Sequence, residues 1–536
     1  MEHGVVEVRG GRVRGVERRG VWTFSGVPYA ASPAGDRRWR PPAPPEPWAG
    51  IRECDAFGPI APQAPGSLET MMGAEPSAWS EDCLSLNVWT PGLDGARRPV
   101  MVWVHGGSFT GGSGSDGFYR GGLLAREQDV VVVTCNYRLG ALGFLAHPDL
   151  AEDGQTWLDG TPWTGWGNWG LADQVAVLAW VRDHVADFGG DPGNVTLFGE
   201  SAGGMSVSAL LSAPAAAGLF HRAVVQSGPP FTAAAGLAAE RAERVAAHLG
   251  VPCTRAGLGA VPAERLVEVV GEFAGRSGDD DAGLLLMPVV DGGLVTRPPL
   301  DAVVDGAASG VPLLCGTTRD EWTMFAIGDP NFATLDRERL TRWVRRVLPD
   351  PDDAPAVIEG VRAARAARGE SVEPRDLWTA IGAEFVFRVG TVRLADAHAA
   401  AAAPGTGTFA YLFTWESPIF GGALGACHAL EVPFVFGAVR TAGIQGFTGG
   451  GEPALALSAA MRQAWAAFAR TGVPASGPEG SDPVPWPQWD AARRPTTVLG
   501  PWPGGDGPVH RADDPRGGEL DAVSAVVGPR PGHHGA

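Results

Sequence analysis

Residues 197–204 read LFGESAGG, in which Ser201 has a glycine two positions before it and another two positions after it. The sequence contains 77 glycines and 22 serines among its 536 residues. With that composition, chance alone supplies roughly half an occurrence of this spacing. The pattern by itself therefore does not assign a role to Ser201, and the neighbouring sequence has to decide.

The segments on either side of Ser201 favour a sharp turn between a strand and a helix. VTLF at 195–198 is a short apolar run that predicts a strand, and the small and apolar residues that begin with SAGGMSVS are typical of a helix start. A nucleophilic serine needs such a turn, because side chains at Gly199 and Gly203 would crowd the strand and the helix. The N–H of Ala202, at the helix N-terminus, is then expected to stabilise an oxyanion.

A second glycine-rich segment, HGGSFTGG at 105–112, directly follows the apolar run VMVWV. Adjacent glycines let backbone N–H groups face a ligand without obstruction by side chains, and a loop after an early strand completes an oxyanion hole in this way. We expect Gly106 and Gly107 to be the donors. An ordinary glycine-rich turn explains this segment equally well when it is considered alone.

The order of strands and helices predicts an α/β fold with a large, mostly parallel central sheet flanked by helices. Several strands are continuous apolar runs, as expected for strands that are covered on both faces. The predicted strands cover residues 86–90, 100–105, 130–134, 195–198, 223–228, 312–316 and 408–415. Residues 171–188 show the spacing of an amphipathic helix, and residues 454–471 predict a late helix.

We expect one domain over residues 1–515, although 536 residues exceed the usual size of a single domain. Residues 231–290 and 326–405 have helical spacing and are interpreted as helical insertions, which are candidates for a lid. Residues 516–536, which end in VVGPRPGHHGA, are rich in glycine and proline and are expected to form a flexible tail.

Composition excludes several classes of function. The net charge of −18 and the absence of a dense basic block argue against nucleic acid as a partner. No apolar run is long enough to span a membrane, and the charged start MEHGVVEVRGG does not resemble a signal peptide, so we expect a cytoplasmic protein. The six cysteines lack paired spacing, and we expect neither a metal nor a cofactor. Monomer and homodimer remain equally open.

Long motifs along the chain resemble those of a known enzyme family. In order, they are EDCLSLNVWTP, PVMVWVHGGSF, NYRLGALGFL, GNWGLADQ, FGGDPGNVTLFGESAGG and QSG. They are similar to the type-B carboxylesterase and cholinesterase family of α/β-hydrolases, and especially to its bacterial p-nitrobenzyl esterase members. The similarity is dense from about residue 5 to residue 230 and continues as islands to about residue 495. It implies the α/β-hydrolase fold.

The resemblance also implies an acid at Glu321, in GTTRDEW, and a histidine at His428, in CHALEVPFVFG. The chain order of this fold, serine then acid then histidine, leaves five histidines after Glu321. They are His398, His428, His510, His533 and His534. His398 lies in an alanine-rich helix and the last three lie toward the expected tail, so His428 is the best candidate. Asp320 and Asp291 are alternatives for the acid, and the preference for Glu321 over Asp320 rests on the resemblance alone.

Three further positions are implied to support the site: Ser227 in QSG, Asn168 in GNWG and the adjacent Trp169. Core packing is an equally good interpretation of Ser227. Arg138 and Asp173 are interpreted as a structural charge pair.

The sequence departs from the family pattern in two places. Ala61 replaces the cysteine that usually pairs with the one matched by Cys83, and Cys54 is a possible substitute partner. The segment TWLDGTPWTGWGNWG at 156–170 is unusually rich in tryptophan. Its four tryptophans, which either line an aromatic gorge or pack on one another, are Trp157, Trp163, Trp166 and Trp169.

These observations predict a serine carboxylesterase that hydrolyses small-molecule esters, with aryl and benzyl esters as candidates, through an acyl-enzyme and a triad of Ser201, His428 and Glu321. An amidase or an acyltransferase would use the same residues. A non-catalytic, cholinesterase-like binding protein is the alternative from another class.

Overall fold

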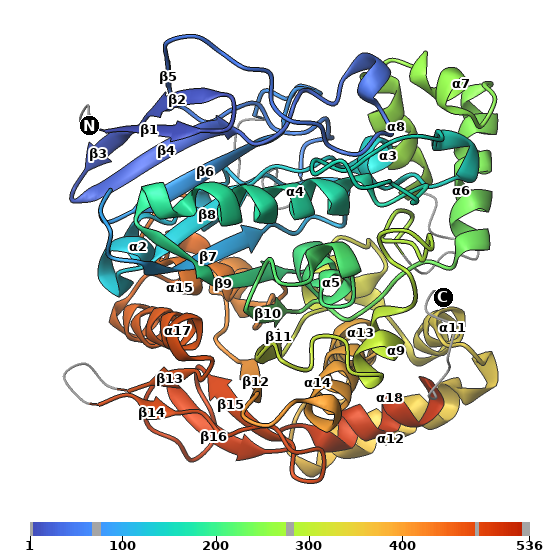
Figure 1. The fold of residues 1–536 in the computed structure, drawn as a ribbon. Coiled ribbons are helices and arrows are strands. Elements are labelled where there is room, and N and C mark those ends of the chain that lie inside the picture. Colours follow the sequence, from blue (N-terminus) through green and yellow to red (C-terminus); the bar gives the residue numbers. More distant parts are fainter. Residues whose placement is uncertain (1–3, 67–76, 275–283, 478–481, 528–536) are drawn as a thin grey trace. The chain divides into compact units, whose positions relative to one another are not determined.

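The computed structural model describes residues 4–66, 77–274, 284–477 and 482–527 (Figure 1). The chain forms two compact units. The N-terminal unit contains Met1–Val224, Phe231–Ser277 and Leu284–Ala302. The C-terminal unit contains Val225–Pro230, Gly278–Gly283 and Val303–Ala536. The strand β10 (Arg222–Gln226) includes the point at which the chain passes from the first unit to the second. A single domain over 1–515 stays a prediction.

The N-terminal unit contains six neighbouring strands of the main sheet. In order they are β9 (Gly190–Glu200), β7 (Arg98–Val104), β8 (Val131–Cys135), β6 (Ser85–Thr90), β4 (Val21–Pro28) and β3 (Val16–Arg18). β9, β7 and β8 are parallel, and the remaining pairs are antiparallel. Val104 of β7 is paired with Gly199 of β9, so both strands end at the same edge of the sheet. This register brings the segments that follow them, at residues 105–107 and at Ser201, to that edge.

Helices pack around these strands, and a separate small sheet is formed by β1 (Val5–Val8), β2 (Gly11–Arg14) and β5 (Ile51–Glu53). The helices of this unit include α2 (Gly122–Gln128), α3 (Gly140–Phe144), α4 (Trp169–His184) and α5 (Ala202–Leu210). α4 was expected to be amphipathic, but every residue from Trp169 to Leu178 is buried, so this part of the helix is covered on all sides. Within the expected insertion 231–290 lie α6 (Ala235–Leu249), α7 (Arg255–Gly259) and α8 (Ala263–Ala274).

The C-terminal unit contains β11 (Leu313–Thr318), β12 (Thr408–Phe413), β15 (Pro495–Leu499) and β16 (Val509–Asp513) in this order. The first three are parallel, and β16 is antiparallel to β15. Its longer helices are α11 (Arg337–Val347), α12 (Ala354–Ala367), α13 (Pro374–Gly382), α14 (Val389–Ala401) and α17 (Glu452–Thr471). A π-helical turn, η8 (Ala383–Arg388), joins α13 directly to α14. β13 (Ala475–Ser476) and β14 (Val484–Pro485) pair on their own.

The structure corrects the expectation of a flexible tail over 516–536. Residues Gly517–Val527 form the helix α18, which lies along α12 (Figure 1). Leu520 and Val523 are buried in the cluster formed by α11, α12 and α13, which explains why this glycine-flanked segment is ordered. His510, also assigned to the tail, lies in β16. Residues 528–536, with His533 and His534, lie outside the described residues.

Each predicted strand and both predicted helices are present, within a few residues of the expected bounds. Strands β1 to β5, the two-residue strands β13 and β14, and the pair β15 and β16 were not predicted. Among the described residues, no helix has the length and apolar character that a membrane crossing requires.

Candidate active site

Ser201 occupies the predicted turn between β9, which ends at Glu200, and α5, which begins at Ala202. Its φ of 55° and ψ of −126° are rare for a residue with a side chain and mark local backbone strain. A Cβ at Gly203 would lie 2.0 Å from the carbonyl oxygen of Val104, and a Cβ at Gly199 would lie 2.6 Å from the carbonyl carbon of Gly203. Both glycines are therefore required for the turn, as the sequence predicted.

The loop after β7 passes directly beside Ser201. A Cβ at Gly106 would lie 3.0 Å from the Cβ of Ser201. Gly107 has a φ of 112°, and its carbonyl oxygen accepts hydrogen bonds from the N–H groups of Thr110 at 3.0 Å and Gly111 at 2.9 Å, which hold the loop. Ala202 is the first residue of α5, where the N–H groups have no acceptor within the helix. The structure thus brings Gly106 and Ser201 together, with Ala202 following in the chain.

His105 anchors this loop, a role that the sequence analysis missed. Its fully buried ring stacks on Tyr137 with centroids 4.3 Å apart, and the Tyr137 hydroxyl donates to the His105 carbonyl at 2.6 Å. Burial lowers the pKa of His105 to about 4, although the Gly106 carbonyl opposes this shift. The ring is therefore neutral at pH 7, and its Nδ1–H donates to the Gly106 carbonyl at 2.8 Å. The sequence feature that could have indicated this role is the position of His105 directly before two glycines.

Glu321 and His428 meet in the C-terminal unit. Glu321 lies in the turn after β11 and is fully buried, with its Oε2 2.5 Å from Nδ1 of His428. Its Oε1 accepts hydrogen bonds from the backbone N–H of Thr318 at 2.7 Å and from the hydroxyl of Ser227 at 2.6 Å. All three contacts constrain the carboxylate. The structure therefore pairs His428 with Glu321, as the family pattern implied.

Asp320, unlike Glu321, contacts the backbone near His428 and not its ring. It forms an ion pair with Arg319 at 2.6 Å and accepts a hydrogen bond from the N–H of Ala426 at 2.8 Å, two residues before His428. Burial acts to raise the pKa of Asp320, but the charge and hydrogen bonds of Arg319 outweigh it, and the pKa is lowered. Asp320 therefore holds the loop that carries His428. Asp291 accepts hydrogen bonds from its own turn, at Gly293 and Val295.

The remaining histidine candidate of the helical segments, His398, is a packed core residue. Its Nδ1 lies 2.7 Å from the hydroxyl of Thr408, and its Nε2 lies 2.9 Å from the carbonyl oxygen of Val311. Both ring nitrogens are thus engaged in structural hydrogen bonds. This agrees with the expectation from the sequence that His398 is not the catalytic histidine.

The three supporting candidates have separate contacts. Ser227 donates to Glu321, so it contacts the acid directly. The Asn168 side chain donates to the carbonyl of Val289 and accepts from its N–H, both at 2.8 Å, and so ties two backbone segments together. Trp169 is fully buried and stacks on Trp163 with centroids 5.4 Å apart. Asn168 and Trp169 therefore support the loop at the start of α4.

The tryptophan-rich segment packs largely on itself. Trp157 meets Trp163 edge to face at 4.7 Å, and Trp163 in turn stacks on Trp169. Trp163 is only 6% exposed, so little of its ring could contact a ligand. These contacts favour the self-packing interpretation over an aromatic gorge for the two buried tryptophans.

Two further expectations concern buried polar groups of the N-terminal unit. In the described parts of the chain, Cys54 and Cys83 are buried free thiols and form no disulfide with each other. Burial raises the pKa of Cys54 to about 12, which keeps this thiol protonated and unreactive. Arg138 and Asp173 form a buried bidentate pair, with distances of 2.8 and 2.7 Å, as the sequence predicted.

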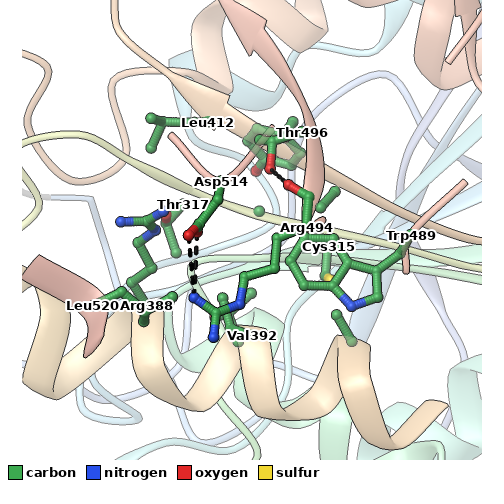
Figure 2. A pocket seen from close by; sticks show the side chains of 15 residues that line it. Cys315, Thr317, Arg388, Val392, Leu412, Trp489, Arg494, Thr496, Asp514 and Leu520 are labelled. Carbon is green, nitrogen blue, oxygen red and sulfur yellow. Dashed lines mark hydrogen bonds and ion pairs between the residues drawn. The ribbon is translucent and has the colours of Figure 1, made fainter. Parts of the chain in front are cut away.

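A cavity of about 30 Å3 lies in the C-terminal unit between β11, β12, β15 and α14 (Figure 2). Arg494 and Asp514 form an ion pair in its wall, to which Arg388 and Trp489 also contribute. This volume has room for about one water molecule and is far smaller than a pocket for an organic ligand. It is therefore not a substrate site.

Comparisons with known proteins show the family of this chain. Residues 2–501 match the model of the Carboxylesterase family. The chain is 36% identical to the para-nitrobenzyl esterase of Bacillus subtilis (strain 168), covering 93% of this chain and 95% of that protein. It is 35% identical to the phenmedipham hydrolase of Pseudarthrobacter oxydans, covering 92% and 95%.

Solved structures give the same result. A carboxylesterase of Geobacillus stearothermophilus matches with a TM-score of 0.81 and 38% identity, covering 97% of this chain and all of the other. A PNB esterase structure matches with a TM-score of 0.78, 33% identity and the same coverage. The fold is thus that of the α/β-hydrolases, and a non-catalytic binding protein is set aside. The chain belongs to the carboxylesterase family and is a carboxylic ester hydrolase.

Proposed function

We propose that Ser201 is the nucleophile, that His428 is its general base and that Glu321 orients His428. The strained turn at Ser201 carries this proposal, because such strain persists only where the surrounding structure enforces it and is concentrated at functional sites. The pairing of Glu321 with Nδ1 of His428 supports the other two roles, since it leaves Nε2 as the nitrogen that exchanges the proton.

In the proposed reaction, the Oγ of Ser201 attacks the ester carbonyl carbon and its proton passes to Nε2 of His428. The N–H groups of Gly106, Gly107 and Ala202 stabilise the negative charge on the carbonyl oxygen. The tetrahedral intermediate then releases the alcohol, which takes the proton from His428, and leaves the acyl group on Ser201. Water repeats these steps and releases the acid. Glu321 stabilises the imidazolium in both halves.

We further propose that the substrates are small-molecule esters, with esters of benzyl and aryl alcohols as the first to test. The support is the similarity to a protein named para-nitrobenzyl esterase. A set of acetate esters with p-nitrophenyl, p-nitrobenzyl, benzyl and ethyl alcohols would rank these alcohols directly by kcat/KM.

The test of the triad is the variant Ser201→Ala, with Ser212→Ala as the control. Ser212 donates to the carbonyl of Ala209 at the end of α5, away from the turn. Ser201→Ala should keep its melting temperature and lose about 10³-fold or more in turnover of p-nitrophenyl acetate, together with labelling by a fluorophosphonate probe. Ser212→Ala should keep both. Near-normal turnover by Ser201→Ala would overturn the proposal.

A further inference from the structure

The imidazole of His428 has to be held in one plane for Nε2 to accept and return a proton. A hydrogen bond at Nδ1, such as that to Glu321, does not by itself fix this plane, because χ2 of histidine has a broad energy minimum. Contacts with the ring faces are what restrict the remaining rotation. The packing around His428 therefore bears on catalysis as well as on stability.

Two phenyl rings pack on His428. The Phe387 ring centroid lies 4.6 Å from that of His428, with 38° between the ring planes, and the Phe325 centroid lies 5.2 Å away at 51°. The two phenyl rings also contact each other, at 6.1 Å. Phe387 is 3% exposed whereas Phe325 is 44% exposed. Phe387 is therefore the interior support of the imidazole.

Phe387 belongs to the π-helical turn η8. π-helical turns are rare, and they occur frequently at functional sites. One residue added to an α-helix rotates every following side chain by about 100°, because a turn contains about 3.6 residues. The turn therefore determines which side chain of this segment faces His428, and a regular helix through the same positions would present a different one.

The next residue, Arg388, ties the turn to the segment before α18. The guanidinium of this buried arginine donates to Glu384 at 2.9 Å, within the same turn, and to the backbone carbonyls of Pro515 and Arg516. The turn is thus held on both sides of Phe387, by the side chain of Glu384 and by a distant part of the chain. Such anchoring is expected of an element whose position matters, since a fixed ring is needed to fix its neighbour.

We propose that η8 positions the catalytic imidazole, with Phe387 as a positioning residue that acts through His428 and Arg388 as its anchor. This inference rests on the proposed function of His428. In this proposal, Phe387 acts on the reaction through its contact with the His428 ring. Loss of the Phe387 ring misaligns Nε2 during proton transfer and therefore lowers kcat. Substrate binding is not affected, so KM stays unchanged.

The matched test compares Phe387→Leu with Phe385→Leu. Phe385 lies in the same turn but packs against the cluster of α11, α12 and α13. Both variants lose a ring from η8. With p-nitrophenyl acetate, we expect kcat of Phe387→Leu to fall about 10- to 100-fold with KM changed less than about twofold. We expect Phe385→Leu to lower the melting temperature and to keep kcat within about threefold.

A double-mutant cycle distinguishes positioning from a general loss of structure. In a His428→Ala background there is no imidazole to align, so adding Phe387→Leu should leave the residual rate unchanged. Equal kcat values for the two leucine variants would overturn the inference, as would a further fall in the His428→Ala background. If Phe387→Leu does not fold, Arg388→Lys replaces it, because lysine cannot span the two carbonyls, and it should lower kcat in the same His428-dependent way.

The same experiments separate this inference from the proposed function. If His428→Ala keeps nearly full activity, the role of His428 is wrong and the inference fails with it. If His428→Ala is inactive and Phe387→Leu is normal, only the inference fails.

Discussion

The Nδ1 atom of His428 lies 2.5 Å from Oε2 of Glu321, although the two residues are 107 positions apart in the chain. The other oxygen of the carboxylate is held by Thr318 and Ser227. Asp320, the adjacent residue, instead holds the backbone at Ala426. Two consecutive acids therefore serve the same histidine in different ways, one through its ring and the other through its loop.

These different contacts predict that substitution of Glu321 impairs activity, whereas substitution of Asp320 impairs stability. Glu321→Gln should lower kcat/KM for p-nitrophenyl acetate on the order of 10³-fold, because the amide does not stabilise an imidazolium. Asp320→Asn should keep kcat within about threefold, since an amide oxygen still accepts from Ala426, but it loses the ion pair with Arg319 and should melt at a lower temperature. The opposite ranking of activities would transfer the role of the acid to Asp320.

A methyl group on the oxyanion loop should impair turnover. Gly106→Ala places a Cβ 2.8 Å from Oε2 of Glu200 and 3.0 Å from Cβ of Ser201, so the loop has to shift. We expect kcat to fall by about 100-fold or more, as for the loss of an oxyanion donor. Gly236→Ala is the control, because a Cβ there meets no atom within 4 Å and alanine favours the helix α6. Full activity of Gly106→Ala would exclude a tight approach of this loop to Ser201.

The buried His105 predicts a dependence of stability on pH. Its pKa is about 4 in the folded protein, against 6.5 for an ordinary histidine. Between these values the unfolded chain binds a proton that the folded chain does not, so the free energy of unfolding decreases as the pH falls from 6.5 to 4. In His105→Asn, the amide can still donate to Gly106 but does not titrate, and this decrease should become smaller by up to about 1.4 kcal/mol per pH unit.

Urea unfolding of both proteins at several pH values between 4 and 7 measures this difference. Other buried histidines, such as His398, whose pKa burial also lowers, are present in both proteins and cancel in the comparison. Parallel curves for the two proteins would contradict the assignment of a neutral His105.

The helix α18 should contribute strongly to stability through Glu519. This fully buried carboxylate contacts Arg516 at 2.8 Å, Arg368 at 2.9 Å and Arg365 at 3.5 Å. Glu519→Ala removes the buried one of the two acids that these cations share, the other being the partly exposed Glu370, and we expect a loss of about 3 kcal/mol. Glu338→Ala, which removes an exposed pair with Arg342, should cost less than about 1 kcal/mol. Equal melting temperatures for the two variants would show that the Glu519 cluster does not stabilise α18.

The strands and the turn at Ser201 were predictable because local residues determine them. Gly199 and Gly203 are required by atoms within the same turn or in the adjacent strand, and the apolar runs of β7 to β9 are typical of buried parallel strands. Choosing Glu321 over Asp320 from the residues alone was not possible. That choice depends on where Arg319 and Ala426 lie, and the second is more than 100 residues away.

The helix α18 was not predicted from the sequence, for a related reason. The glycines and prolines of residues 516–536 indicate flexibility locally, whereas the partners of Glu519 and Leu520 lie on α12 and α13, far back in the chain. The same applies to the packing of Phe387 on His428, because no local pattern in the sequence identifies a π-helical turn. Interactions between distant residues thus account for both omissions.

The packing of α18 also bears on how the folded protein associates with other chains. Leu520 and Val523 complete the apolar core over α12 and α13. Local detachment of α18 therefore uncovers apolar surface on those two helices, and an exposed apolar patch favours association with other chains. Conditions that loosen this one helix should promote aggregation before the rest of the unit unfolds.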